Sequence, residues 1–387
     1  MHQTNVVNGL TIYFPKKLVI GNDVLKQLPQ DIIQQGYKKV FVITIEPLLT
    51  TIDFLIFELK KAGVDLGIDV SIVQEPGFAD VQRLIDMFGG FQPDVIVGIG
   101  GGSVLDVAKV VAAQLENKQR LSEYVGIGLL SGRKKGLICV PTTAGTGSEV
   151  SPNSILVDDS DGQKKGIISP YLVPDSVYLD PLLTLKVPAA ITAATGLDAL
   201  THCLEAYTNK FSHPFIDLYA FEGMKLIASN IVRAVKDGRN EEARTHVALG
   251  SLYGGFCLGP VNTAGVHALS YPLGSTFHLA HGLSNALLLP YVMEYNLPAA
   301  PKRYAEVAIA LGCERENDDM STAKKGIEKI RELIKHCGIP ATLKEVNIPA
   351  DAIPQMAKDA LKIQRLLKNN PRVITEQDAV AIYQAAY

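Results

Sequence analysis

The side chains best suited to chemistry lie in the second half of the chain, where histidines occur among apolar residues. Asp198 and His202 are four residues apart, a spacing that places both on one face of a helix. His267 and His281 follow, fourteen residues apart. One carboxylate and three imidazoles could together bind a divalent first-row metal such as Fe(II) or Zn(II), with room left for a substrate or water. A single histidine of this kind is more often a packed structural residue, so the hypothesis depends on the whole set.

A run of glycines in the first half suggests a phosphate-binding loop. In the stretch DVIVGIGGGSVLDVAK, a hydrophobic strand leads directly into Gly101, Gly102 and Ser103, and a helical pattern follows. Glycines let the backbone approach a pyrophosphate, and the free amides at the start of a helix attract its charge. Ser103 with Asp106 three residues later also predicts a helix cap, so a plain capped turn stays an alternative.

A second polar loop, PTTAGTGSEVSPN at residues 141–153, follows another strand. It carries hydroxyl groups at Thr142, Thr143 and Thr146 among glycines. The backbone and side-chain donors of such a loop could surround a ligand with several polar groups, such as a dinucleotide. The alternative is a turn rich in Ser and Thr that makes only local backbone bonds.

The elements that must position these residues differ between the two halves of the chain. The first half alternates β-branched runs with helical patterns, which is typical of a parallel sheet flanked by helices. Its strands are expected at 38–44, 69–74, 94–102 and 136–143, and its helices through the fifties and near 80–90. Beyond residue 181, apolar residues recur every three or four positions. Helices are expected there at 188–209, 215–236 and 241–258. We therefore expect an α/β domain over residues 1–184 and an all-helical domain over residues 185–387.

Composition narrows the classes of protein. With 387 residues, of which 47% are hydrophobic, the chain can bury a large core, which excludes a disordered protein. A net charge of -3 without a long basic run argues against nucleic acids and anionic membranes as partners. The N-terminus lacks a signal-peptide pattern, and the five cysteines are scattered without paired spacing. These features predict a soluble, cytoplasmic protein.

The motifs, taken in order, resemble a known family. GGGSxxDxAK, PTTAGTGSE, AATGLDALTHCLEAY, and VHxLxxPLG followed by HGxxNAxLLP occur here in the order and spacing of the iron-containing (group III) alcohol dehydrogenases. That family includes lactaldehyde and propanediol oxidoreductases and is related to dehydroquinate synthase. The resemblance covers about residues 10–385, and the set of motifs is specific.

The resemblance implies a fold and a set of site residues. It implies an N-terminal dinucleotide-binding domain, a helical domain that holds iron or zinc, a cleft between them, and a homodimer or larger homo-oligomer. By motif position, the metal ligands would be Asp198, His202, His267 and His281. The cofactor's phosphates would contact Gly101, Gly102, Ser103, Thr142, Thr143 and Thr146, with Asp106, Asn153 and Lys164 nearer the nicotinamide and its ribose.

Two departures from the family pattern bear on mechanism and on cofactor choice. Many members have a histidine four residues after the third ligand, where this chain has Tyr271, and His278 stands three residues before the last ligand instead. Tyr271 and His278 are therefore further candidate catalytic residues, and the proton-relay role of the family histidine does not carry over to this chain. Where members that prefer NAD often have Thr-Asp after the first strand, this chain has Thr44, Ile45 and Glu46. NAD is expected, and NADP is not excluded.

The predicted function is reversible, metal-dependent hydride transfer between a short primary alcohol or diol and its aldehyde, with a nicotinamide cofactor. One alternative is a hydroxyacid-oxoacid transhydrogenase, which would turn over without added free cofactor. Another is a dehydroquinate synthase-like lyase, which would need several Lys and Arg near the site, whereas residues 188–208 and 256–292 contain none. A non-catalytic protein that binds NAD or stores metal would need no open coordination position.

Overall fold

The computed structural model describes residues 9–72, 76–88 and 90–387 of the chain. Its contacts divide the chain into two compact units, one over residues 13–187 and one over residues 188–387. Residues 9–12 group with the second unit, although the sequence assigned the whole N-terminal stretch to the first domain. Residues 9–12 are assigned to the second unit because of the contacts that they make in the folded chain. Local sequence patterns do not predict such contacts.

The first unit is built on a six-stranded sheet in which all the paired strands run parallel, as the sequence predicts. The strand order is β1-β9-β6-β4-β2-β3. The strands are β1 (Lys17–Ile20), β2 (Lys39–Ile43), β3 (Asp65–Asp69), β4 (Val95–Gly100), β6 (Gly136–Pro141) and β9 (Ser176–Leu179).

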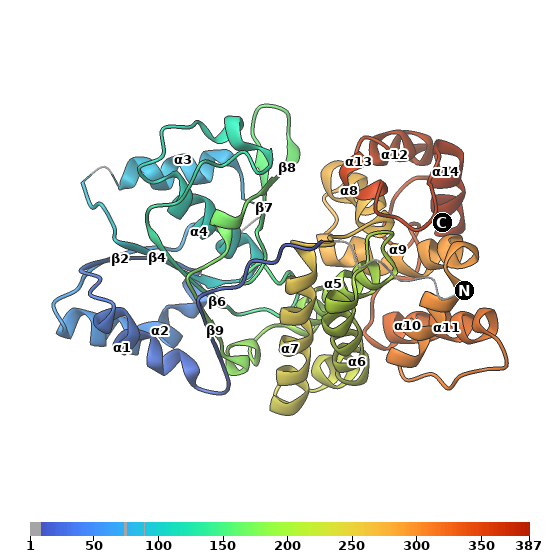
Figure 1. Cartoon of the computed structure of the whole chain (residues 1–387), viewed down its shortest axis with the longest axis horizontal. Helices are drawn as coiled ribbons and strands as arrows, with labels where there is room; N and C mark the ends of the chain where they lie inside the picture. Colours follow the sequence, from blue (N-terminus) through green and yellow to red (C-terminus); the bar gives the residue numbers. More distant parts are fainter. Residues whose placement is uncertain (1–8, 73–75, 89) are drawn as a thin grey trace. The chain divides into compact units, whose positions relative to one another are not determined.

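Helices cover both faces of this sheet (Figure 1). α1 (Leu28–Gln34) and α2 (Leu49–Lys61) lie on one face, and α3 (Phe78–Met87) and α4 (Gly102–Gln114) lie on the other. Successive side chains of a strand point to opposite faces, and β2 follows this rule. Val40 and Val42 pack in the core cluster that includes α1 and α2, whereas Phe41 and Ile43 pack in the cluster that includes α3 and α4. Burial on both faces explains why the central strands are continuous apolar runs.

One predicted strand is misplaced, and several observed strands were not predicted. The strand expected at 69–74 lies at 65–69 as β3, and residues 73–75 of that expectation fall outside the described residues. β3 pairs only with β2, so it is an edge strand, and its segment DLGID has no apolar run that would mark it. A three-stranded sheet was also not predicted, and it consists of β5 (Gly126–Ile127), β8 (Gln163–Ile168) and β7 (Asn153–Asp158).

The second unit is helical, and the three helices predicted at its start are confirmed. They are α5 (Ala189–Thr208), α6 (Pro214–Lys236) and α7 (Glu241–Leu258). The remaining helices are α8 (Gly265–Phe277), α9 (His281–Asn296), α10 (Pro301–Ala310), α11 (Asp319–His336), α12 (Ile353–Ala360), α13 (Gln364–Leu367) and α14 (Glu376–Ala385). The expected architecture, a parallel α/β unit followed by an all-helical unit, is therefore confirmed.

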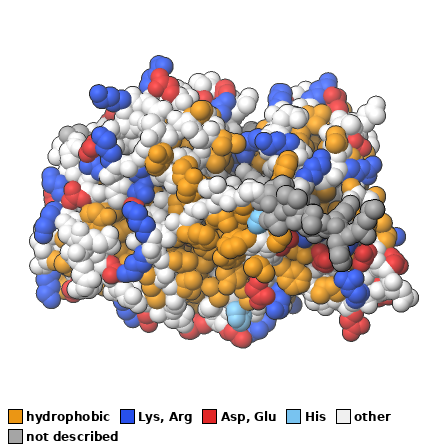
Figure 2. Space-filling view, in the orientation of Figure 1, with side chains coloured by type: hydrophobic (Ala, Val, Ile, Leu, Met, Phe, Trp, Pro, Cys, Tyr) orange, Lys and Arg blue, Asp and Glu red, His pale blue; other side chains and the backbone are white. Residues whose placement is uncertain are grey.

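The surface has the mixed charge expected from composition. On the face drawn in Figure 2, basic and acidic side chains are interspersed and do not gather into a broad patch of one sign. Among the described residues, no helix is both long and apolar enough to cross a membrane.

Candidate metal centre and nucleotide-binding loops

A buried carboxylate surrounded by imidazoles forms the candidate metal centre in the helical unit. Oδ1 of Asp198 lies 3.6 Å from Nε2 of His267, 3.8 Å from Nε2 of His202 and 3.9 Å from Nε2 of His281. Ligand atoms of Asp198, His267 and His281 all lie within 4.8 Å of one another. His202 borders this triplet, with its ring stacked on that of His267 at a centroid distance of 4.8 Å. The structure thus brings together the four residues that the sequence singled out.

Three helices supply these side chains, and one glycine lets two of them approach closely. Asp198 and His202 come from α5, His267 from the first turn of α8, and His281 is the first residue of α9. At Gly282, a Cβ atom would lie only 2.4 Å from the carbonyl oxygen of Ala194 in α5. Because Gly282 has no side chain, the start of α9 rests directly on the backbone of α5, and His281 reaches Asp198.

Glu205, which the sequence analysis did not single out, anchors the start of α8. Its carboxylate accepts hydrogen bonds from the backbone amides of Ala264 at 3.0 Å and Val266 at 2.6 Å. It also lies 2.6 Å from Nδ1 of His267. A carboxylate that accepts from the outer nitrogen of a histidine fixes the ring orientation and leaves Nε2 to face a metal. Glu205 lies seven residues after Asp198 on the same helix face, and this spacing was the available signal.

The donor set fits a divalent cation. At metal bonds of about 2.1 Å, tetrahedral ligand atoms are separated by about 3.4 Å, close to the distances measured here. Nε2 of His267 is buried, and among the described residues it has no hydrogen-bond partner. Asn285, one turn after His281, donates to Oδ1 of Asp198 at 2.7 Å and holds that carboxylate in place. An oriented carboxylate and a buried nitrogen without a partner are what a metal would satisfy.

The charges of this cluster favour an anionic carboxylate. Burial disfavours ionisation of Asp198, but the neighbouring histidines hold the pKa of its carboxyl well below the ordinary value. Burial also disfavours a charged His267 ring, yet the negative charges of Glu205 and Asp198 raise its pKa to about 9. A metal would compete with a proton on this ring, so metal binding is expected to release a proton.

The two further candidate catalytic residues, His278 and Tyr271, occupy different places. His278 follows α8 as its C-cap with a left-handed φ of 55° and is exposed, and among the described residues no hydrogen bond, ion pair or ring contact joins it to the cluster. The centroid of the Tyr271 ring lies 6.4 Å from that of the His281 ring, and the two ring planes are inclined by 30°. The Tyr271 hydroxyl accepts a hydrogen bond from Arg365 in α13 at 2.5 Å. Arg365 lies outside residues 188–208 and 256–292, which contain no Lys or Arg, and only the fold brings it to Tyr271.

In the α/β unit, the two polar loops leave the sheet from neighbouring strands. β4 and β6 are paired in parallel with Gly100 opposite Pro141, so both loops start at the same edge of the sheet. Ligands of parallel α/β sheets bind at this carboxyl edge. The loops also touch, because a Cβ atom at Gly102 would lie 2.5 Å from Cγ2 of Thr146. The glycine is therefore needed for packing of the two loops as well as for any approach of a phosphate.

The predicted cap at the start of α4 is wrong. The N-cap residue is Gly101, which has no capping side chain, and Ser103 lies inside the first turn. Asp106 instead accepts hydrogen bonds from the Ser148 hydroxyl and, at 2.8 Å, from the amide of Ile155. Asp106 is thus used to fasten the second loop and the strand that follows it, and the amides at the start of α4 are left without a side-chain cap.

Lys109, one turn further along α4, also forms hydrogen bonds with the second polar loop. Its buried ammonium donates to the carbonyl oxygens of Ser148 and Ser151, each at 2.9 Å, and also to the carbonyl of Asn153. Oδ1 of Asn153 is buried and has no partner among the described residues, so this amide is available to a ligand. Lys164 lies on β8, the strand that pairs with the β7 strand carrying Asn153.

The loop contains a buried acid whose ionisation opposes folding. Burial raises the pKa of Glu149 to about 7, and the positive charge of Lys109 counters this only in part. An acid with a raised pKa stabilises the fold most at low pH, and that contribution is lost as pH rises from its ordinary value through about 7.

We therefore predict that Glu149→Gln raises the free energy of unfolding at pH 8 by roughly 2 to 3 kcal/mol and has little effect at pH 4.5. Urea denaturation at the two pH values measures the difference. Equal effects of the substitution at both pH values would contradict the assigned cause.

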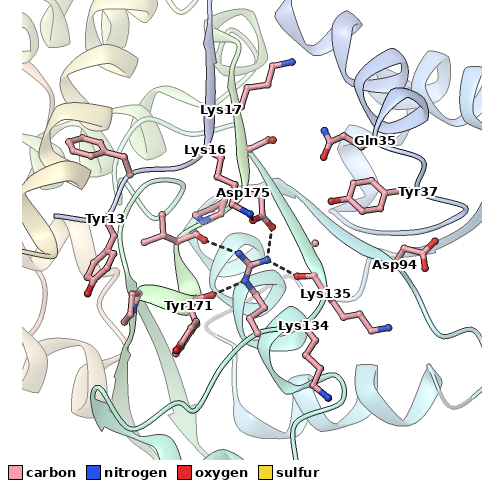
Figure 3. Close-up of a pocket in the computed structure, with 17 residues that line it drawn as sticks. Tyr13, Lys16, Lys17, Gln35, Tyr37, Asp94, Lys134, Lys135, Tyr171 and Asp175 are labelled. Carbon is pink, nitrogen blue, oxygen red and sulfur yellow. Dashed lines mark hydrogen bonds and ion pairs between the residues drawn. The ribbon is translucent and has the colours of Figure 1, made fainter. Parts of the chain in front are cut away.

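The α/β unit also has a pocket at the opposite edge of the sheet. It has a volume of about 730 Å³ and lies at the amino ends of β1, β6 and β9. Figure 3 shows Lys16 and Asp175 on one side of it, and these two form an ion pair at 2.9 Å. Lys17 pairs with Asp31, and Lys135 with Glu116. Arg133 also pairs with Asp175, and Lys134 with Glu116, so each of these cations already lies beside a carboxylate.

Comparison with known proteins identifies the family of this chain. Residues 15–181 match the profile of the iron-containing alcohol dehydrogenases, and residues 192–387 match that of the Fe-containing alcohol dehydrogenase family, C-terminal. The chain belongs to the iron-containing alcohol dehydrogenase family. It is accordingly an oxidoreductase, and the resemblance stated from its motifs is confirmed.

Relatives of this iron-containing alcohol dehydrogenase carry several names. It is 37% identical over 383 residues to long-chain-alcohol dehydrogenase 1 of Geobacillus thermodenitrificans (strain NG80-2), with 97% of this chain and 96% of that protein covered. It is 31% identical to a sulfoacetaldehyde reductase of Bilophila wadsworthia (strain 3_1_6), with 97% and 98% covered. A crystal structure of 1,3-propanediol oxidoreductase superimposes with a TM-score of 0.94 at 33% identity, covering 98% and 100%.

Proposed function

We propose that this chain catalyses NAD-linked interconversion of a short primary alcohol or diol with its aldehyde, with one Fe(II) or Zn(II) bound per chain. The observation that supports this most directly is the buried carboxylate of Asp198, with Nε2 atoms of three histidines within 4 Å of its Oδ1. The His281 side chain is 33% exposed, whereas those of His202 and His267 are almost fully buried. A substrate would therefore approach from the His281 side.

Asp198, His267, His281 and His202 would hold the metal, with His202 as the fourth ligand by motif position. When bound, the metal supplies Lewis-acid chemistry, stabilising the negative charge that develops on the alcohol oxygen. Glu205 keeps the His267 ring fixed through Nδ1, and Asn285 keeps the Asp198 carboxylate fixed through Oδ1. Such outer hydrogen bonds preserve ligand geometry while the charge on the substrate changes.

The reaction breaks one C–H bond of the alcohol carbon and forms one C–H bond at the nicotinamide ring. The hydride carries both electrons of the broken bond, the hydroxyl proton leaves to solvent, and the aldehyde and reduced nicotinamide are the products. In the α/β unit, backbone amides at Gly101, Gly102 and Ser103 and the hydroxyls of Thr142, Thr143 and Thr146 would hold the pyrophosphate. The amide of Asn153 and the ammonium of Lys164 would contact the nicotinamide ribose.

Cofactor preference is proposed from the end of β2. Glu46 is exposed in the short turn that follows this strand, at the edge of the sheet where the nucleotide is expected. Its carboxylate would repel a 2′-phosphate and could accept a hydrogen bond from a ribose hydroxyl. NAD should therefore be used at least as well as NADP.

The cellular location and the number of subunits of the enzyme are also proposed. We propose a cytoplasmic homodimer in which the α/β unit of residues 13–187 binds the nucleotide and the helical unit binds the metal. The cytoplasmic location is supported by the five cysteines, which are all free thiols. Sedimentation or size-exclusion measurements would test the dimer.

The decisive experiment follows nicotinamide absorbance with C2 to C5 alcohols, diols and aldehydes, with and without added Fe(II) or Zn(II). We expect metal-dependent turnover with NAD. Glu46→Gln should improve kcat/KM with NADP by a few-fold, since one repulsive surface charge is removed, and leave alcohol preference unchanged. The substitution Asp53→Asn, on the following helix, serves as the matched control for charge.

Three outcomes would count against the proposal. A strong NADP preference of the unmodified protein would overturn the cofactor assignment. Turnover of a hydroxy acid with an oxo acid, but none with added free NAD, would favour a transhydrogenase. An absence of hydride transfer with every compound would favour a lyase of the dehydroquinate synthase type.

A further inference from the structure

Arg365 is a half-buried cation beside the candidate metal centre. It lies on α13, which packs against α8, the helix that carries His267 and Tyr271. Within the described part of the chain, its guanidinium donates one hydrogen bond, to the Tyr271 hydroxyl, and lies 5.7 Å from the centre of the Tyr271 ring. Among the described residues, no carboxylate lies within ion-pair distance of it.

This lack of a carboxylate distinguishes Arg365 from the other partly buried arginines. Arg133 is paired with Asp175, and Arg303 with Asp217. A guanidinium has five N–H donors in a planar fork that matches a carboxylate or a similar oxyanion. The single hydrogen bond to Tyr271 leaves most of these donors for solvent or a ligand. Because that bond uses a lone pair of the Tyr271 hydroxyl, the hydroxyl proton also stays available to an acceptor.

The pair Tyr271–Arg365 stands on the accessible side of the cluster. The ring centroids of Tyr271 and His281 lie 6.4 Å apart, and His281 is the most exposed histidine of the set. A compound whose oxygen lies at the metal position would therefore extend past His281 toward the Tyr271 hydroxyl and the Arg365 guanidinium.

We propose that Arg365, with Tyr271, recognises an anionic group at the far end of the substrate, so that the preferred substrate is a short ω-hydroxy acid or hydroxyalkyl sulfonate and its aldehyde. This inference rests on the proposed alcohol dehydrogenase function. The reacting carbon undergoes the same hydride transfer, and the anion takes no part in bond making. Arg365 is thus a specificity-determining residue that touches the unreactive end of the substrate.

The test compares two substrates of equal length, 4-hydroxybutanoate and the neutral butane-1,4-diol, in the metal-loaded full-length protein with NAD. The unmodified protein should have the higher kcat/KM for the hydroxy acid. Arg365→Met should lower kcat/KM for the hydroxy acid by about 10- to 100-fold, the value of a charge-assisted hydrogen bond, and change that for the diol less than about threefold. Arg365→Lys should give an intermediate loss, because lysine keeps the charge without the fork.

Lys368→Met provides the matched control, since Lys368 is an exposed cation that directly follows the same helix. It should leave both substrates unaffected. A parallel measurement with 3-hydroxypropane-1-sulfonate distinguishes sulfonate from carboxylate recognition. A preference of the unmodified protein for the diol, or an equal loss for both substrates in Arg365→Met, would overturn the proposal.

A binding measurement separates failure of this inference from failure of the proposed function. Calorimetric titration with propane-1-sulfonate, a weak metal ligand that cannot react, requires no hydride transfer. Binding that weakens about 10-fold or more in Arg365→Met supports the anion site even if no alcohol is oxidised. Equal binding by both proteins overturns it, whether or not neutral alcohols are turned over.

Discussion

A His267→Ala variant is expected to lose its metal and, with it, on the order of a thousandfold in kcat/KM for the alcohol, since the Lewis acid contributes several kcal/mol to the barrier. His267 supplies a buried nitrogen whose orientation is fixed by Glu205 and which has no other partner among the described residues. Its removal takes away one ligand and leaves the Glu205 carboxylate without that ring. Asp198→Ala, His202→Ala and His281→Ala should each weaken metal binding in the same direction.

Metal content after mild purification is the primary measurement, because it does not depend on knowing the substrate. His278→Ala is the matched control, since this exposed histidine lies outside the cluster, and it should retain full metal content. Retention of metal by both His267→Ala and His281→Ala would refute the assignment of these ligands. Circular dichroism of each variant shows whether metal was lost through unfolding.

Gly102→Val should raise the KM for the nicotinamide by about 100-fold and that for the alcohol far less. A side chain at this position would stand between the backbone and a pyrophosphate. It would also collide with Thr146, whose Cγ2 lies 2.5 Å from the position of an added Cβ, and would push the second loop out of place. Both effects act on the nucleotide, and neither acts on the helices that hold the metal ligands.

The control for this substitution is Gly132→Val, because an added Cβ at Gly132 meets no atom within 4 Å. Gly102→Ala combined with Thr146→Ser removes the Cγ2 collision and should recover part of the nucleotide affinity lost in Gly102→Ala alone. Equal increases in both KM values for Gly102→Val would indicate a folding defect, and unchanged values would remove the phosphate-binding role.

Much of the fold could be predicted because its elements follow simple periodicities. The central strands β2, β4 and β6 are apolar runs buried on both faces, and α5, α6 and α7 carry a clear helical period. Strand β3 was misplaced because an edge strand is buried less and needs no apolar run. Strands β5, β7 and β8 were missed because they form a small sheet of their own, with short or partly exposed strands.

The candidate site was predicted only as far as its residue types are distinctive. The histidines and the loop glycines were predicted because imidazoles are common metal ligands and because glycines after a strand let the backbone approach a phosphate. Glu205 was not predicted, because a carboxylate on a helix usually lies in solvent. Its contact with the amides at the start of α8 depends on how the two helices pack. Arg365 could not be placed from sequence, since its contact with Tyr271 joins residues 94 positions apart.

Side chains of α4 fix the conformation of the loop after β6 before any nucleotide binds. Lys109 in α4 donates hydrogen bonds to three backbone carbonyls of the loop and of the strand that follows it. Asp106, also in α4, accepts hydrogen bonds from Ser148 and Ile155. The conformational entropy of this segment is therefore lost during folding and not again on association. Nucleotide capture should for this reason proceed at a rate set by diffusion and orientation, without a slow ordering step.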